Sequence, residues 1–396
     1  IFSAMLSLIT GFFLCKNRSK YWDSVIHGLA QYANARLIFI FLIIGIFSKV
    51  MSTGNIGGGF VWLSLRLGIE GSGFVVFSFL ASAIISMGAG APIAALFAVI
   101  PIFYPPGILL GAGPAMLTGA LISGIFFGDA LSPSSQVINT TIMIQHDKAT
   151  GRPADLLNTM KKRTPYILAA GAVSILIYYF FGASNGNPGD INEIGNYSQA
   201  AGLLMLIPIV VLLTICFKTR NLFMGLSFGI VTGLLIGLVS GLFSFSDIVD
   251  IDYETGSLTG VIFEGIYGML DVTVSTILLY GLIAVAVDGG MLEKCCDFIL
   301  SRDFTKTKRG AESVLMACTM IINVLLAGCV LPSILMFGDA ADRIGQASDI
   351  TPERRSILLM AGATNVSSII PINSAFVMGS VTIINEIVQN NSFLPH

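Results

Sequence analysis

The residues best suited to chemistry in this chain form one short polar stretch, 128–141. Apolar runs at 116–127 and 142–146 flank it, and it holds a carboxylate, Asp129, and a helix-breaking proline, Pro133. A carboxylate among apolar helices is costly unless it binds a partner or carries a proton. A proline there frees backbone carbonyls that must find other partners. These features predict a broken helix with an ion or substrate site at its break, as secondary transporters have.

Asp129 is the candidate cation ligand or proton carrier of that site. A carboxylate that is partly removed from water holds its proton more readily, so it can exchange a proton for a cation near neutral pH. The alternative is that Asp129 caps the next helical piece from the membrane interface. Hydroxyl and amide side chains around the break favour the binding site; they are Ser132, Ser134, Ser135, Asn139 and Thr140.

A second polar stretch, 365–374, contains the same kinds of side chain and its own break at Pro371. Its oxygen donors suit an alkali cation and can also hold a substrate carboxylate. The alternative is that these small polar residues hold helices together, which is common in membranes. The candidate binding residues are Asn365, Ser367, Ser368 and Asn373. A third break, at Gly90 and Pro92, is a further possible wall of the site.

The composition predicts an all-α polytopic membrane protein. Of the 396 residues, 54% are hydrophobic and 11% are charged, against about 25% charged in a soluble domain. The apolar runs are continuous, whereas a β-barrel would show alternating segments. We therefore expect the lipid bilayer as a partner, and no nucleic acid, because no basic face is present.

Motifs for enzymatic chemistry are missing from the sequence. There is no GxxxxGK for an ATP-driven pump and no GxSxG or HExxH for a hydrolase. The six cysteines show no metal-binding spacing. We predict that the protein is not an enzyme, and that it needs no cofactor and no metal beyond a transported alkali cation.

Charged loops predict the orientation of the spans. Basic loops at 16–20 and 148–163 are expected in the cytoplasm. Loops at 184–199 and 247–254 are expected outside, because the first contains no Lys or Arg and the second is acidic. This arrangement predicts a multi-pass membrane protein, and the inner (plasma) membrane is what the family resemblance given below implies.

Several element boundaries are predicted that bear on the structure. We expect one helix to end at Tyr104 before a Pro-Pro-Gly sequence, and a long helix over 311–337 to break near Gly328 and Pro332. An amphipathic helix is expected over 258–269. Glycines at every fourth position of another helix predict very close packing, within the subunit or between protomers; they are Gly225, Gly229, Gly233, Gly237 and Gly241. Lys49 and Glu264 are expected to reach toward the membrane interface.

The two halves of the chain align at an offset of 236 residues. Gly45 then falls on Gly281, and Ser132 falls on Ser368. Equivalent helices are entered from a basic loop in one half and an acidic loop in the other, which predicts inverted-topology repeats with broken helices or re-entrant hairpins. We predict a first repeat at 1–184, an external linker at 185–198 and a second repeat at 199–396. We also expect a terminal helix of the second repeat, and the true N-terminus, to lie beyond this sequence.

The run from Ile122 to Ser135, which reads ISGIFFGDALSPSS, resembles the signature of the NhaC family. That family holds sodium/proton antiporters, a malate/lactate antiporter and amino-acid transporters. The resemblance implies that Na⁺ and H⁺ are transported by alternating access, in a homodimer. Two departures leave an organic solute open as the substrate. Gln136-Val137-Ile138 stands where the family usually has Asp-Thr-Thr, and Gly88-Ala89-Gly90-Ala91 replaces a Thr/Ser-rich break.

Two other functions stay open from the sequence. One is a cation- or proton-coupled transporter of an amino acid or small carboxylate on the same scaffold. It would need a cationic group or a helix N-terminus to hold the substrate carboxylate. The other is a membrane sensor or scaffold that transports nothing.

Overall fold

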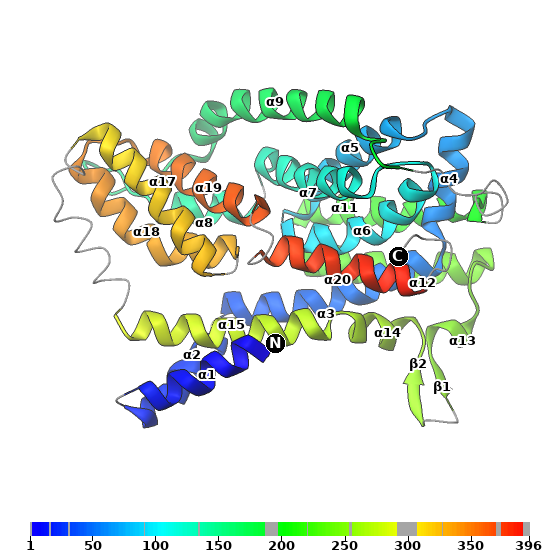
Figure 1. The fold of residues 1–396 in the computed structure, drawn as a ribbon, viewed down its shortest axis with the longest axis horizontal. Coiled ribbons are helices and arrows are strands. Elements are labelled where there is room, and N and C mark those ends of the chain that lie inside the picture. Colours follow the sequence, from blue (N-terminus) through cyan, green and yellow to red (C-terminus); the bar gives the residue numbers. More distant parts are fainter. Residues whose placement is uncertain are drawn as a thin grey trace. The chain divides into compact units, whose positions relative to one another are not determined.

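The computed structural model describes residues 2–390 apart from 16, 31, 91, 134, 187–196, 220, 253–255, 291–306, 327 and 370–373. Within these residues the chain is helical except for loops and one short β-hairpin (Figure 1). Four helical segments there are long and apolar enough to cross a membrane: 114–131, 156–181, 223–240 and 261–282. A pair bent by 51°, 38–53 and 56–67, is a fifth candidate. The prediction of an all-α polytopic membrane protein is confirmed.

The chain divides into two compact units, each assembled from separate segments of the sequence. We name each unit after one of its helix pairs. The α5–α7 unit comprises residues 42–135, 164–269 and 379–396. The α17–α19 unit comprises residues 1–41, 136–163 and 270–378.

The α5–α7 unit contains the helix in whose last turn the first polar stretch begins. Its elements are the second part of α3 (Tyr32–Thr53), α4 (Ile56–Leu67), α5 (Ser72–Ala89), α6 (Pro92–Leu109), α7 (Pro114–Leu131), most of α9 (Leu156–Phe181), the 3-10 helix η1 (Ala200–Met205), α11 (Leu206–Thr219), α12 (Leu222–Ser240), α13 (Phe245–Ile248), β1 (Asp250–Asp252), β2 (Ser257–Thr259), α14 (Val261–Gly268) and most of α20 (Ala375–Asn390). The two strands pair antiparallel, with Ile251 opposite Leu258.

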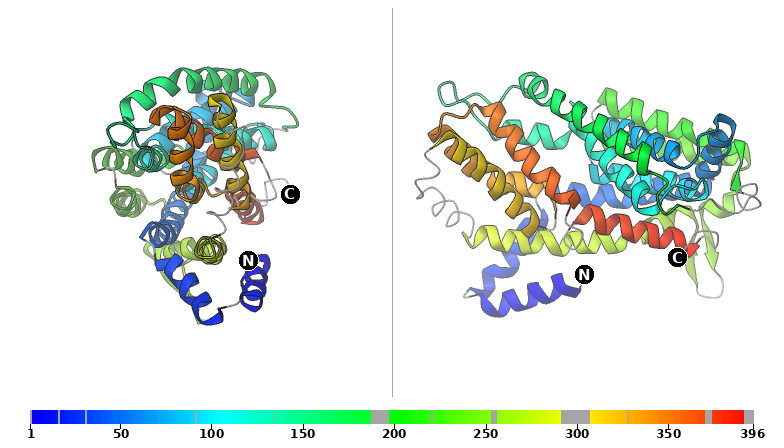
Figure 2. Two further views of the ribbon diagram at one scale, coloured as in Figure 1. Left: turned by 90° about the vertical axis from the view of Figure 1, so that its left-hand side faces the viewer. Right: turned by 45° about the horizontal axis from the view of Figure 1, so that its top comes forward.

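The α17–α19 unit contains the second polar stretch. Its elements are α1 (Phe2–Leu14), α2 (Arg18–Ala30), the first part of α3, α8 (Gln136–Met143), α15 (Leu270–Asp288), α17 (Lys308–Leu325), α18 (Val330–Ala347) and α19 (Pro352–Ile369). Helices α17 and α19 lie side by side, as Figures 1 and 2 both show.

Helices α5 and α7 pack against each other in parallel, because bare glycine backbone allows a close approach. A Cβ atom added to Gly124 would collide with the carbonyl oxygen of Phe79, and one added to Gly128 would collide with that of Ala83. The contacts advance along both helices in the same direction, so the two helices also end at the same level. Such close contact between small residues is typical of helices in membranes.

Helices α17 and α19 form a second parallel pair. Near their first turns, the Arg354 guanidinium contacts the Glu312 carboxylate at 3.0 Å. Further along, a Cβ added to Gly362 would lie 2.9 Å from Cβ of Thr319. At the far end, a Cβ added to Gly328 would lie 3.4 Å from Cα of Ser367. The break after α17 therefore lies beside the end of α19.

A buried network of charged and polar groups joins α18, α19 and the loop after α8 in the same unit. The side chain of Arg355 is 1% exposed and donates to Oδ1 of Asp342 at 2.8 Å and to Oε1 of Gln145 at 3.1 Å. The amide of Gln145 donates to the Gly338 carbonyl at 2.9 Å. Because every partner in this chain of contacts is buried or partly buried, the network fixes how these three elements pack.

The end of α6 differs from the prediction, whereas the break predicted near Gly328 and Pro332 is confirmed. Helix α6 continues through Pro105 and Pro106 to Leu109 instead of ending at Tyr104. A proline removes one helical hydrogen bond but keeps a helical φ, so a helix whose end is buried can continue with a bend. Helix α18 begins at Val330, so Pro332 lies in its first turn, where backbone N–H groups have no helical partner to lose. The break lies between α17 and α18, beside Gly328.

Two further boundaries differ from the prediction. The segment expected to form a helix from Leu258 begins with strand β2, and α14 starts at Val261. Helix α19 extends to Ile369, so most of the second polar stretch that is described is helical rather than unwound. The Ser367 and Ser368 hydroxyls donate to backbone carbonyls three residues earlier, which satisfies both groups inside the helix.

The glycine face of α12 packs within the subunit. A Cβ on Gly225 would collide with the sulfur of Cys216 on α11, and one on Gly233 would lie 2.8 Å from Val50 on α3. Gly229 and Gly237 are similarly close to side chains of the same unit. The glycines therefore allow α12 to approach α3 and α11 closely.

Candidate ion-binding site at two helix breaks

The breaks after α5 and α7 are joined directly. Helix α5 ends at Gly90, which adopts a left-handed conformation with φ 62°, and α7 ends at Ser132. The Ser132 hydroxyl donates to the carbonyl oxygen of Met87 at 2.7 Å. One helix end thus caps the other, and the two C-termini lie next to each other.

Asp129 lies in the last turn of α7, at this junction. Its side chain is only 3% exposed. The Ser135 hydroxyl donates to its Oδ2 at 2.9 Å. The next helix, α8, begins at Gln136, so its cap position is Ser135 rather than Asp129. The structure therefore holds Asp129 inside a helix, with its carboxylate directed at the break.

The electrostatics of the junction favour a cation. The last four carbonyls of a helix lack helical partners, and the helix dipole places partial negative charge at this end. Here two such ends and one carboxylate meet within the same unit. Carbonyl, hydroxyl and carboxylate oxygens are the donors that broken helices offer to transported alkali cations.

A row of buried serines leads along α5, and the sequence analysis did not identify it. Ser78, Ser82 and Ser86 recur at every fourth position, and each is fully buried. The row faces α7, because a Cβ on Gly124 would lie 3.0 Å from Cβ of Ser82. The Ser82 hydroxyl donates to the carbonyl of Ser78 at 2.6 Å. The fourfold spacing of serines in an apolar helix was the signal that could have revealed this row.

Two of these hydroxyls indicate that a polar path runs along α5. The side-chain oxygens of Ser78 and Ser86 have no hydrogen-bond partner among the described residues. Buried hydroxyls are normally hydrogen-bonded, so each such group needs a water or an ion as its partner. The row is therefore suited to line a hydrated route beside the α5–α7 contact.

The candidate residues of the second polar stretch lie in the other unit. Asn365 is exposed, Ser367 is buried and Ser368 is partly buried, all in the last two turns of α19. The Ser374 hydroxyl donates to the Ser367 carbonyl, across the break before α20. The remaining described candidates of this unit, Asn139 and Thr140, are partly buried on α8, which packs against α19.

The structure thus brings the sequence-predicted residues together in two groups. Asp129, Ser132 and Ser135 gather in the α5–α7 unit. Asn365, Ser367 and Ser368 gather in the α17–α19 unit, where the polar residues of α8 also lie. Ser134, Pro371 and Asn373 lie outside the described residues. Over the described part of the chain, no group of three or more His, Cys, Asp or Glu side chains could hold a metal ion.

Apolar spanning helices with a buried carboxylate at paired helix breaks define a membrane transporter as the class of protein. Residues 192–389, half of the chain, match the model of a family described as the Na⁺/H⁺ antiporter family. The chain belongs to this family. The match includes the second polar stretch, and Asp129 lies before it. A comparison with curated proteins found no match.

Membership in the family has two plain consequences. The protein is a multi-pass membrane protein, and it is a cation/proton antiporter rather than an enzyme.

Proposed function

We propose that this protein is an NhaC-like antiporter that exchanges sodium for protons by alternating access, with Asp129 as the coupling carboxylate. One observation carries the proposal: a buried carboxylate lies in the last turn of α7, where two parallel helices end together. Na⁺ and H⁺ are substrates here, and the chain itself supplies the groups that bind them.

The proposed exchange is a competition at one carboxylate. Sodium binds when Asp129 is charged. Carbonyl oxygens at the C-terminal ends of α5 and α7 contribute further ligands. A proton that binds to the same carboxylate removes its charge and releases the cation. Ser135 favours the charged form, because its hydroxyl donates to Oδ2.

Helix lengths support the proposed repeats. Helices α5 and α17 both contain 18 residues, and α17 begins at Lys308, 236 residues after Ser72. Helices α6 and α18, and helices α7 and α19, are also 18 residues long and follow in the same order. We propose inverted repeats over 1–184 and 199–396 with a linker over 185–198. A homodimer in the plasma membrane is part of the same proposal and rests on the family resemblance.

Exchange can be measured in proteoliposomes that carry a pH-sensitive dye. An inside-acid pH gradient is imposed, and sodium, lithium or potassium is then added outside. The proposal predicts that sodium or lithium collapses the gradient, while protein-free liposomes keep it. If none of the three cations has an effect, the proposal is wrong, and a coupled transporter of an organic solute becomes the better reading.

A further inference from the structure

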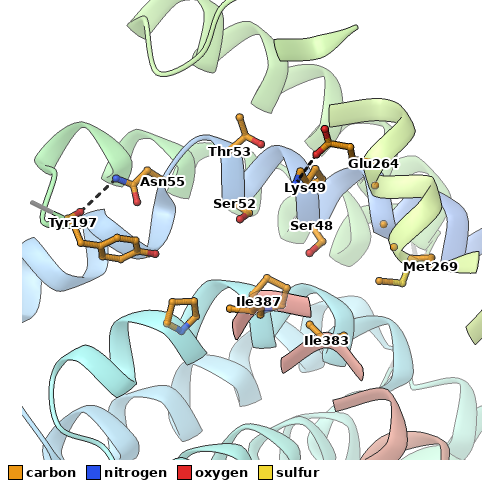
Figure 3. Close-up of a pocket in the computed structure, with 16 residues that line it drawn as sticks. Ser48, Lys49, Ser52, Thr53, Asn55, Tyr197, Glu264, Met269, Ile383 and Ile387 are labelled. Atoms are coloured by element: carbon orange, nitrogen blue, oxygen red, sulfur yellow. Dashed lines mark hydrogen bonds and ion pairs between the residues drawn. The ribbon is translucent and has the colours of Figure 1, made fainter. Parts of the chain in front are cut away.

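A polar cavity lies in the α5–α7 unit, away from the α5–α7 break. Its volume is about 440 Å³. Residues of α3, α4, α6, α14 and α20 line it, together with Tyr197 (Figure 3). Ser48 and Ser52 lie on the side of α3 that faces Ile383 and Ile387, which supply an apolar wall, and Thr53 lies on the side of Lys49 and Glu264.

Two opposite charges meet at this cavity. The Lys49 ammonium lies 2.8 Å from Oε2 of Glu264, and the side chains are 32% and 47% exposed. Both belong to segments apolar enough to span a membrane. The sequence predicts that both side chains reach toward the membrane interface, and the structure shows that they also pair with each other. Charged residues in spanning helices usually mark a functional site, and these two are partly open to an entering molecule.

A glycine contact fixes the position of this pair. A Cβ on Gly45 would collide with the carbonyl oxygen of Gly265, so α3 and α14 touch through their backbones. Gly45 lies one helical turn from Lys49, and Gly265 follows Glu264. The contact therefore sets where the two charges meet at the wall of the cavity.

The cavity also holds a helix N-terminus. Helix α4 contains 12 residues and starts after Asn55, whose side-chain oxygen accepts from the Gly58 N–H. Gly57, in the first turn of α4, lines the cavity. The positive end of a helix favours an anionic group, and it adds to the charge of Lys49.

Acceptors face the same space. The carboxylate of Glu264 is one, and the hydroxyl oxygens of α3 are others. Pro105 has no N–H to donate to the carbonyl of Pro101, and both prolines line the cavity. Burial raises the pKa of Tyr197 to about 12, so its phenol keeps its proton at neutral pH.

We propose that this cavity binds a small zwitterionic solute with one carboxylate and one ammonium group. Lys49 and the α4 N-terminus hold the carboxylate, Glu264 holds the ammonium, and Ile383 and Ile387 contact the apolar part. The volume argues for an organic molecule, because ligand pockets span roughly 300–1,000 Å³ and a bare alkali cation would fill little of it. The inference does not depend on exchange at Asp129.

Thermal unfolding of the purified protein in nanodiscs of phosphatidylglycerol tests the proposal. The probes are glycine, L-alanine and L-leucine, with acetate and ethylamine as analogues that carry a single charge. We expect at least one amino acid to raise the midpoint with a saturable concentration dependence, and both analogues to be weaker. The double variant Lys49→Met/Glu264→Gln removes both charges together, so neither is left unpaired. We expect it to fold and to bind at least about tenfold more weakly.

The matched control is Lys162→Met/Glu353→Gln, which removes an ion pair of 3.3 Å in the other unit. It should bind like the wild type. The proposal is overturned if no amino acid binds, or if the Lys49/Glu264 double variant binds as tightly as the wild type. A second set of discs contains phosphatidylethanolamine, whose headgroup has the same two charges. Stabilisation by that lipid alone, lost in the double variant, would overturn the free solute as the occupant.

Discussion

In the proposed exchange, the hydroxyl of Ser135 acts on the balance between the protonated and the sodium-bound forms of Asp129. It donates to the carboxylate at 2.9 Å, and such a hydrogen bond favours the charged form. Under this proposal, a charged carboxylate binds sodium, whereas a protonated one does not. We therefore expect the balance of exchange to depend on this contact.

Replacing Ser135 with alanine should raise the sodium concentration at which exchange is half-maximal. The loss of one hydrogen bond to a charged group costs roughly 1.5 kcal/mol, equivalent to about a tenfold change in an equilibrium constant. Dye-loaded proteoliposomes titrated with sodium would measure the shift. Ser123→Ala is the control, because Ser123 lies on α7, like Asp129, but its hydroxyl contacts that of Tyr178 on α9 at 2.7 Å. An unshifted profile for Ser135→Ala would contradict this role.

At this scale, the sequence predicted the polar residues of the break but not all of their partners. Asp129 and Pro133 were recognisable because charge and proline are rare in apolar runs. The contact of Ser132 with Met87 was not recognisable, because these residues are 45 positions apart and meet only where α5 and α7 end at the same level. The pairing of Lys49 with Glu264 likewise depends on a backbone contact between α3 and α14.

At the scale of elements, the parallel contact of α5 and α7 positions the two breaks. Gly128 is next to Asp129 and touches the backbone of Ala83. A side chain there must push α7 away from α5, and that movement would separate the two helix ends. The geometry of the candidate site therefore depends on a residue that binds nothing itself.

Gly128→Ala should lower the exchange rate strongly and destabilise the protein by about 1–3 kcal/mol, the usual effect of overpacking. Exchange assays and thermal unfolding in detergent would measure both effects. Gly119→Ala on the same helix is the matched control, because the nearest atom to its new Cβ is the Tyr178 hydroxyl oxygen at 3.8 Å. Equal behaviour of the two variants would show that the close contact is not required.

The network around Arg355 makes a second prediction for elements. Arg355→Met leaves the partly buried Asp342 without its guanidinium, and breaking one side of a buried pair costs up to about 3–5 kcal/mol. Its neighbour Arg354 pairs with Glu312 while 47% exposed, so Arg354→Met should cost at most about 1 kcal/mol. Urea or thermal unfolding of both variants would compare them. A similar loss in the two would contradict the structural role of Arg355.

Helix positions were predictable from apolar periodicity and length, but several ends were not. Helix α6 passes its prolines because its last residues are buried, and tertiary packing overrides the local preference. The β-hairpin at 250–259 begins within the acidic loop at 247–254, which has no strand-like pattern. Helix α19 keeps its polar last turns because its serines bond to their own backbone.

At the scale of the whole molecule, the membrane is the solvent of many exposed apolar side chains. Helix α9 is the clearest case, because only 6% of its apolar window is buried. Leu176, Tyr179 and Phe180 are more than half exposed. Composition predicted such a lipid-facing helix, since a chain that is 54% hydrophobic cannot hide all of these residues in a soluble core.

Leu176→Asp should therefore impair membrane insertion, because a charge within a spanning helix is costly, by up to about 2.5–3.5 kcal/mol at the helix centre. Leu157→Asp is the control. Leu157 is also exposed but lies in the first turn of α9, where an acidic residue is tolerated or favourable. The amount of each variant in isolated membranes would be compared. Equal amounts of both would mean that α9 does not face lipid at Leu176.

The most direct test of the account is the effect of Asp129→Asn on sodium-driven proton movement in dye-loaded proteoliposomes. Asparagine keeps the size of the side chain but can neither carry a proton nor offer a negative charge. The account predicts that the wild type collapses an imposed pH gradient when sodium is added, that Asp129→Asn does not at any pH, and that Asp129→Glu retains part of the activity. Wild-type exchange by the folded, reconstituted Asp129→Asn variant would contradict the central claim.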